Sequence, residues 1–140
     1  MRINTSLNTY DIRDDILTFK LLDTGDIQKI VYNDKIINQL RGNRMEAMPG
    51  NVYLRIKTEN GYEYTKILGD QNNASITYGR TSVTYKGEFQ NIEYSVVLTV
   101  IKNAWFIKTN LVNKRDDFPI IDLFYAQDIG INHRNPILSN

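Results

Sequence analysis

The stretch DLFYAQDIG, residues 122–130, brings polar chemistry to the end of a predicted strand, where Gln127 and Asp128 follow four residues suited to an extended segment. An amide and a carboxylate at such a position could contact a ligand, or could accept and donate the backbone hydrogen bonds that fix a corner. Because Gly130 follows two residues after Asp128, the pattern favours a corner set by the carboxylate. A role facing a sugar or a neighbouring domain is the alternative.

Groups that could make or break bonds are scarce in the rest of the sequence. His133 is the only histidine and lies in the polar, proline-containing tail GINHRNP, which is a poor place for a Ser/His/Asp arrangement. The chain has no cysteine, so disulfides, cysteine zinc sites and thiol nucleophiles are excluded. Phosphate-binding and nucleophile-elbow motifs are also missing. The sequence therefore predicts no catalytic residue and no cofactor.

An acidic cluster of Asp11, Asp14 and Asp15 is the only hint of a metal site, and it does not follow the spacing of a calcium-binding loop. We expect these three residues to lie in a solvated loop before the first strand, and we predict no metal. The 16 acidic residues make pairs of carboxylates unavoidable, so spacing alone does not single out a glycosidase-type pair.

Aromatic residues are the more informative class, with nine Tyr, five Phe and one Trp. A ring with a polar edge can stack against the C–H face of a sugar while its polar atom meets the hydroxyl rim. Tyr62 and Tyr64 share one face of a predicted strand, and Trp105 could pair with a cross-strand tyrosine. The same rings are also ordinary core or cross-strand partners. The candidate carbohydrate-binding residues are Trp105, Tyr62, Tyr64, Gln127 and Asp128.

The elements that would position these residues follow a period of two. Ile92, Tyr94, Val96, Leu98 and Val100 alternate with more polar residues and predict a strand. The short turn at 102–104 joins it to a second alternating segment at 105–112, so an antiparallel hairpin is expected.

Turn signals divide the upstream sequence into further short strands. Residues 16–38 predict three strands, separated by turns at 23–26 and 33–34. Residues 51–68 predict a hairpin with a type I′ turn at Asn60-Gly61. Residues 75–90 predict two strands, with bends or bulges at Gly79-Arg80 and Gly87. With no convincing amphipathic helix, about ten strands predict a single all-β domain, an antiparallel β-sandwich spanning residues 1–140.

The net charge and the hydropathy of the sequence argue against nucleic acid and membranes as partners. The 17 basic and 16 acidic residues leave a formal charge of +1, which provides no field for binding nucleic acid or an anionic membrane. The N-terminal residues lack the apolar core of a secretory signal, and no apolar run is long enough to span a bilayer. We therefore expect a cytoplasmic protein without nucleic-acid or membrane partners.

Three longer stretches resemble a known group of enzymes: INQLRGNRMEAMPGNVYLRI (37–56), WFIKTNLVNKRDDFPIIDLFYAQDIGI (105–131) and HRNPILSN (133–140). They look like the N-terminal region of glycoside hydrolase family 94 phosphorylases, closest to 1,2-β-oligoglucan phosphorylases and the phosphorylase module of cyclic β-1,2-glucan synthases. The resemblance covers most of residues 12–140. It implies a galactose-mutarotase-like super-sandwich, possibly partial, which in that family precedes a helical barrel.

In that family the catalytic acid and the phosphate-binding groups belong to the barrel, so the resemblance implies a non-catalytic N-terminal domain or fragment of a larger enzyme. Such a domain would frame a substrate entrance or a subunit contact; a free-standing carbohydrate-binding module is the alternative. A complete small enzyme of mutarotase type is the least favoured interpretation. The implied partners are a β-glucan oligosaccharide and the remainder of the parent enzyme or a second copy. A partial sandwich would leave an apolar face or an open edge uncovered, which favours self-association.

Overall fold

The computed structural model describes residues 8–43, 50–130 and 132–133. These residues form three antiparallel sheets and one 3₁₀ turn, η1 (Gln71–Asn73). Sheet A contains β1 (Thr9–Asp14), β2 (Leu17–Leu22), β3 (Ile27–Tyr32), β4 (Lys35–Ile36) and β12 (Asn132–His133). Sheet B, in spatial order, contains β11 (Ile121–Gln127), β5 (Gly50–Thr58) and β6 (Gly61–Lys66). Sheet C contains β10 (Ala104–Asn113), β9 (Ile92–Ile101), β8 (Ser82–Phe89) and β7 (Ser75–Tyr78).

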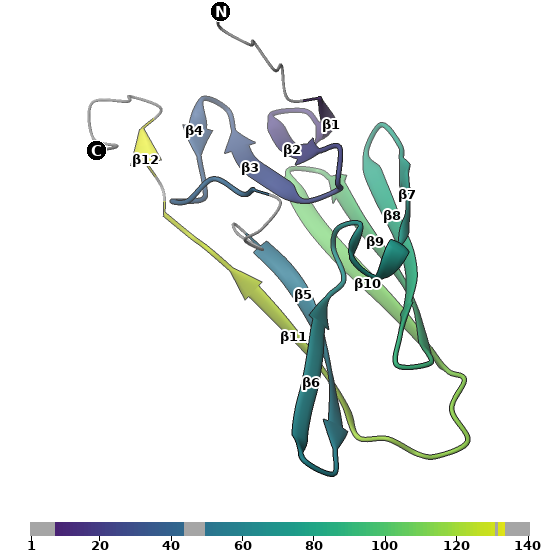
Figure 1. The fold of residues 1–140 in the computed structure, drawn as a ribbon. Coiled ribbons are helices and arrows are strands. Elements are labelled where there is room, and N and C mark those ends of the chain that lie inside the picture. Colours follow the sequence, from purple (N-terminus) through teal and green to yellow (C-terminus); the bar gives the residue numbers. More distant parts are fainter. Residues whose placement is uncertain (1–7, 44–49, 131, 134–140) are drawn as a thin grey trace, which may run out of the picture.

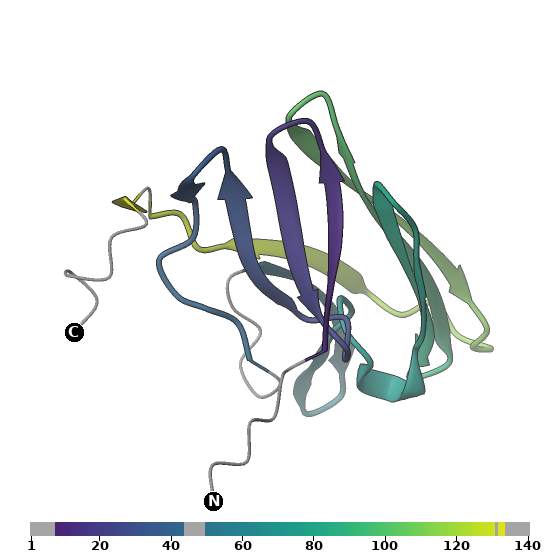
Figure 2. The same cartoon turned by 90° about the horizontal axis from the view of Figure 1, so that it is seen from above.

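This arrangement confirms the predicted all-β, antiparallel, sandwich-like fold class. Figures 1 and 2 both place β1 and β2 between β3 and sheet C, while β11 runs beside β5 towards β12. The described part of the chain contains no helix long and apolar enough to cross a membrane.

The centre of sheet C is the β9–β10 hairpin, which forms as the alternation predicted. Its ladder runs without interruption from Ile101 opposite Ala104 to Ile92 opposite Asn113. The loop consists of Lys102 and Asn103, with φ of 50° and 57°. Two consecutive residues with positive φ fit a type I′ connection, whose twist matches that of the flanking strands.

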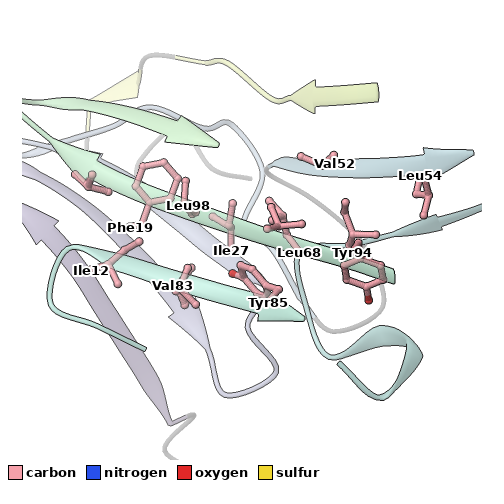
Figure 3. Packing of buried hydrophobic residues seen from close by; sticks show 14 of the residues in the cluster. Ile12, Phe19, Ile27, Val52, Leu54, Leu68, Val83, Tyr85, Tyr94 and Leu98 are labelled. Atoms are coloured by element: carbon pink, nitrogen blue, oxygen red, sulfur yellow. The ribbon is translucent and has the colours of Figure 1, made fainter. Parts of the chain in front are cut away.

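One hydrophobic core joins all three sheets, because its buried side chains come from β1, β2 and β3 of sheet A, from β5 of sheet B, and from β8 and β9 of sheet C. Phe19 comes from sheet A, Leu54 from sheet B and Leu98 from sheet C, and each is at most 1% exposed. In Figure 3, Phe19 lies beside Leu98, and Leu54 lies farther along the same row of buried side chains, beyond Ile27, Leu68 and Val52. Burying a side chain of this size stabilises the fold by about 1.5–3 kcal/mol. The sheets therefore depend on one another for stability.

The β5–β6 hairpin forms, but the prediction of its turn was wrong by one residue. Thr58 pairs with Gly61, so the loop residues are Glu59 and Asn60, and neither takes a positive φ. Gly61 instead begins β6 with φ of 136°. The connection is therefore not type I′. The predicted turns at 23–26 and 33–34 are present, with Gly25 at φ 78° and Asn33 at φ 57°.

Gly87 is not the predicted bend or bulge, because β8 keeps a regular register with β9 on both sides of it. A Cβ atom at Gly87 would overlap the hydroxyl oxygen of Tyr94, its cross-strand neighbour. The absence of a side chain therefore lets the Tyr94 ring lie over the strand. Its hydroxyl donates a hydrogen bond to the carbonyl of Gln71, at 3.2 Å, which ties η1 to sheet C.

The prediction of a solvated loop at the acidic cluster was also wrong, because Asp11 and Asp14 belong to β1. Asp11 forms an ion pair with Lys20 of β2, and the Asp14 carboxylate accepts a hydrogen bond from the backbone N–H of Lys102. These contacts fix β1 to β2 and to the β9–β10 loop. Among the described residues, no group of three or more His, Asp or Glu side chains is arranged to hold a metal ion.

Candidate functional site: the groove between β10 and β11

An open groove of about 350 Å³ lies between β10 of sheet C and β11 of sheet B. Both are edge strands, paired on one side only, so the sandwich opens between them. The lining residues are Val52, Trp105, Ile107, Thr109, Leu123, Phe124 and Tyr125. The groove is therefore mainly apolar and aromatic, which is typical of sites for small molecules or for packed side chains.

A chain of hydrogen bonds gives this groove a polar edge. The indole N–H of Trp105 donates to the hydroxyl of Tyr125 at 3.1 Å, and that hydroxyl donates to Oε1 of Gln127 at 2.5 Å. The amide Nε2 of Gln127 then donates to the backbone carbonyl of Asp128 at 3.0 Å. Each group orients the next, so the polar edge is fixed without a ligand.

The Tyr125 hydroxyl stays protonated at neutral pH. Burial against the groove wall raises the pKa of the Tyr125 phenol, and this effect outweighs the hydrogen bond from Trp105, which lowers the pKa. A neutral phenol can donate one hydrogen bond and still accept others. The hydroxyl therefore links Trp105 to Gln127 as an acceptor and a donor at once.

The side of Trp105 that faces away from the groove packs against the core. Its ring contacts Phe19 edge to face, with the ring centroids 5.4 Å apart and the planes at 67°. In the β10 register, Trp105, Ile107 and Thr109 point to the same side of the strand, towards the groove. The sequence left open whether Trp105 is a core residue or a sugar-stacking residue. In the structure its side chain is partly buried, at the boundary between the core and the groove.

Tyr62 and Tyr64 do share one face, but it is the outer face of sheet B, and neither residue lines the groove. The guanidinium carbon of Arg55 lies 4.3 Å from the Tyr62 ring centroid and 4.5 Å from that of Phe124. Asp122 accepts two hydrogen bonds from Arg55, at 3.0 and 2.7 Å. The structure therefore brings Trp105 and Gln127 together through Tyr125, and separates them from Tyr62 and Tyr64.

Asp128 closes the corner that its sequence context suggested. Its Oδ2 atom accepts hydrogen bonds from the backbone N–H groups of Gln39 and Leu40, at 2.8 and 2.6 Å. Two residues later the N–H of Gly130 donates to the carbonyl of Ile37, at 2.7 Å. The Asp128 carboxylate thus anchors the end of β11 to the segment after β4.

The open side of the sandwich continues beyond the groove as an uncovered apolar segment. We name this segment the apolar edge: the strand β11 and the residues on either side of it, 118–120 and 128–129. Phe118 is 99% exposed, and five more of its large apolar side chains are also exposed. These are Ile120, Leu123, Phe124, Tyr125 and Ile129. The expected uncovered apolar surface is therefore present.

Leu123, Phe124 and Tyr125 line the groove but were not among the residues predicted from the sequence, although they lie in the same stretch as Gln127 and Asp128. The sequence did contain a signal for their role, which is that the three large apolar residues are consecutive. Three consecutive large apolar residues break the alternation of a half-buried strand, so both faces of β11 carry apolar groups. His133 lies in β12, where its backbone pairs with Lys35, and the prediction about its side chain falls outside the described residues.

Comparison with protein-family models assigns the chain to a family. The model described as the SOGP N-terminal domain matches residues 20–140, and no curated protein matches the chain. The matched family differs from the N-terminal regions of glycoside hydrolase family 94 phosphorylases, so the expected membership of that group was wrong. The resemblance rested on strands and corners, which unrelated β-sandwiches also share. With 20–140 matched, the chain belongs to the SOGP N-terminal domain family.

Proposed function

We propose that this chain is a non-catalytic β-sandwich domain that provides a packing surface, in the manner of a domain that frames a substrate entrance or a subunit contact in a larger carbohydrate-active protein. The observation that carries the proposal is the apolar edge, in which Phe118 is 99% exposed and the strand β11 is paired on one side only. The family description as an N-terminal domain agrees with such a role.

The physical reason is the free energy of exposed apolar surface. A contiguous apolar patch on an isolated domain marks a surface that another molecule covers, and an open strand edge adds unpaired backbone groups to it. Covering each large side chain of the apolar edge would contribute up to about 1.5–3 kcal/mol to association before the entropic cost of binding. The residues that line the groove include no His, Asp, Glu, Lys or Arg side chain.

The apolar edge predicts association of the isolated chain. At micromolar concentration, we expect light scattering after size exclusion to report a species larger than the monomer. Replacing Phe118 and Leu123 by serine should shift this species towards the monomer, because two of the six exposed large apolar side chains of the apolar edge are lost.

Phe106→Ser is the matched control for this measurement, since Phe106 is 59% exposed but lies on the outer face of β10, away from the apolar edge. This variant should associate like the unmodified chain. A stably folded chain that stays strictly monomeric would contradict the proposed packing role.

Carbohydrate binding is the second candidate function, and the hydrogen-bond chain in the groove favours it. Trp105 and Tyr125 offer flat apolar rings, while the Tyr125 hydroxyl and the Gln127 amide supply polar atoms at the edge. This combination suits a neutral sugar, whose C–H face is apolar and whose rim carries hydroxyl groups. A β-glucan oligosaccharide is the proposed ligand.

If the groove binds such a sugar, the Tyr125→Phe variant should bind it about 3–10-fold more weakly, because one hydrogen-bonding hydroxyl is lost while the ring remains. Isothermal titration with β-1,2- and β-1,4-linked gluco-oligosaccharides measures the affinity. Tyr64→Phe is the control, since Tyr64 lies on the outer face of sheet B. Absence of heat with the unmodified chain would eliminate the carbohydrate-binding function and leave the packing role in place.

A further inference from the structure

The strand β11 lacks the features with which natural proteins protect an edge strand. Such strands usually carry lysine, proline or a bulge, or are very short. β11 has the sequence IDLFYAQ, and its register with β5 is continuous from Ile121 opposite Ile56 to Gln127 opposite Gly50. Its only charged side chain, Asp122, is already engaged by Arg55. The other edge strand of the groove, β10, contains Lys108. Of the two strands that border the groove, β11 is therefore the better suited to pairing along its open edge.

We infer that the partner covering this edge is a second copy of the chain, whose β11 pairs antiparallel with the first β11 about a two-fold axis at Phe124. This inference rests on the proposed packing role and names its partner. Phe124 is the middle residue of the seven in β11, so a symmetric pairing centred there uses the whole strand. The resulting contact is closed, because the same surface is used by both copies.

The side chains that meet in this register are compatible. Phe124 faces Phe124 of the second copy, and Leu123 faces Tyr125, which are aromatic and aromatic–aliphatic pairs of the kind that stabilise antiparallel sheets. Asp122 faces Ala126, so the two carboxylates do not oppose each other. The pairing therefore adds apolar contacts without like-charge repulsion.

The same register also accounts for the exposed residues just outside the strand. Continued beyond both ends of β11, it brings Phe118 of one copy opposite Gly130 of the other, next to Ile129. Phe118 and Ile129 are 99% and 69% exposed in the single chain. One symmetric contact thus covers the most exposed apolar side chains of the apolar edge. It also joins the two copies of sheet B into one continuous sheet.

The cysteine-free sequence allows a direct test by single-cysteine variants under mild oxidation at micromolar concentration. Directly opposed residues of antiparallel strands have Cα atoms about 4.5–5.5 Å apart, which is within the range that a disulfide bridges. Phe124→Cys should therefore form a covalent dimer. Ala126→Cys should not, because the two cysteines would be offset by four residues along the strand, about 13 Å.

A second measurement covers the case in which Phe124→Cys weakens the contact. Mixing the Leu123→Cys and Tyr125→Cys chains should give a cross-linked heterodimer, and hydrogen exchange of the β11 amides in the unmodified chain should slow as concentration rises. Association without these cross-links and without this protection would overturn the strand pairing but leave the packing role. Absence of any association would overturn both.

Discussion

Replacing Asp26 by asparagine is expected to lower the free energy of unfolding by about 3–5 kcal/mol, because it leaves a buried ammonium group without its counter-charge. Nζ of Lys66 lies 2.5 Å from Oδ1 of Asp26, and the two side chains are only 12% and 3% exposed. Thr24 donates a hydrogen bond to the other carboxylate oxygen at 2.6 Å. The pair connects the β2–β3 turn of sheet A to β6 of sheet B, so its loss loosens the contact between two sheets.

Urea denaturation of the Asp26→Asn variant, followed by tryptophan fluorescence, measures this effect. Asp11→Asn is the matched control, because Asp11 pairs with Lys20 at 3.0 Å near the surface, where an ion pair contributes only about 0–1 kcal/mol. Equal losses in the two variants would show that burial of the Asp26–Lys66 pair is not what makes it important.

Replacing Gly25 by alanine is expected to cost about 2–5 kcal/mol through two separate effects. The residue has φ of 78°, a conformation that costs an alanine roughly 1–2 kcal/mol. A Cβ atom there would also lie 2.6 Å from Cδ1 of Ile76 and 2.8 Å from the Tyr85 ring, and such overpacking costs about 1–3 kcal/mol. Tyr85 has little freedom to move, since it is fully buried and its hydroxyl donates to the Gly25 carbonyl at 2.7 Å.

Gly61→Ala separates the two effects, because Gly61 also has a positive φ, 136°, but has no atom within 4 Å of the position of a new Cβ. We expect Gly25→Ala to lower the denaturation midpoint distinctly more than Gly61→Ala does. Should Gly61→Ala prove as harmful as Gly25→Ala, backbone strain at a positive φ would be sufficient to explain the loss, without crowding by Ile76 and Tyr85.

The strands of sheet C were predictable because one face of each strand points to the core and the other face points to solvent. The residues from Ile92 to Val100 that point inward are apolar, and this alternation identifies both the strand and its buried side. β1 was missed for the opposite reason. Its sequence TYDIRD contains one fully buried residue, Ile12, and three charged ones, of which Asp11 and Asp14 form an ion pair and a hydrogen bond to other segments. Local patterns carry no information about such distant partners.

The groove could be predicted only in part. Trp105 and Gln127 were candidates from their residue types, but the hydroxyl that joins them belongs to Tyr125, which precedes Gln127 by two residues in β11 and lies in a different sheet from Trp105. No hydrogen-bonded register links β10 to β11, so spacing along either strand does not reveal that they face each other. Asp128 was easier, because a carboxylate two residues before a glycine is a local signal for a corner.

The pairing of β11 with β5 has a consequence for how the chain folds. The two strands are separated by the whole of β6 to β10, whereas β9 and β10 meet through a two-residue loop. Contacts between distant segments form slowly, since a long loop must close before they gain any stabilisation. During synthesis the hairpins of sheet C can therefore assemble before β11 has been made and can pair with β5. We therefore expect the completion of sheet B to be a late step in folding, and the period before it to be the one in which the nascent chain is most prone to aggregate.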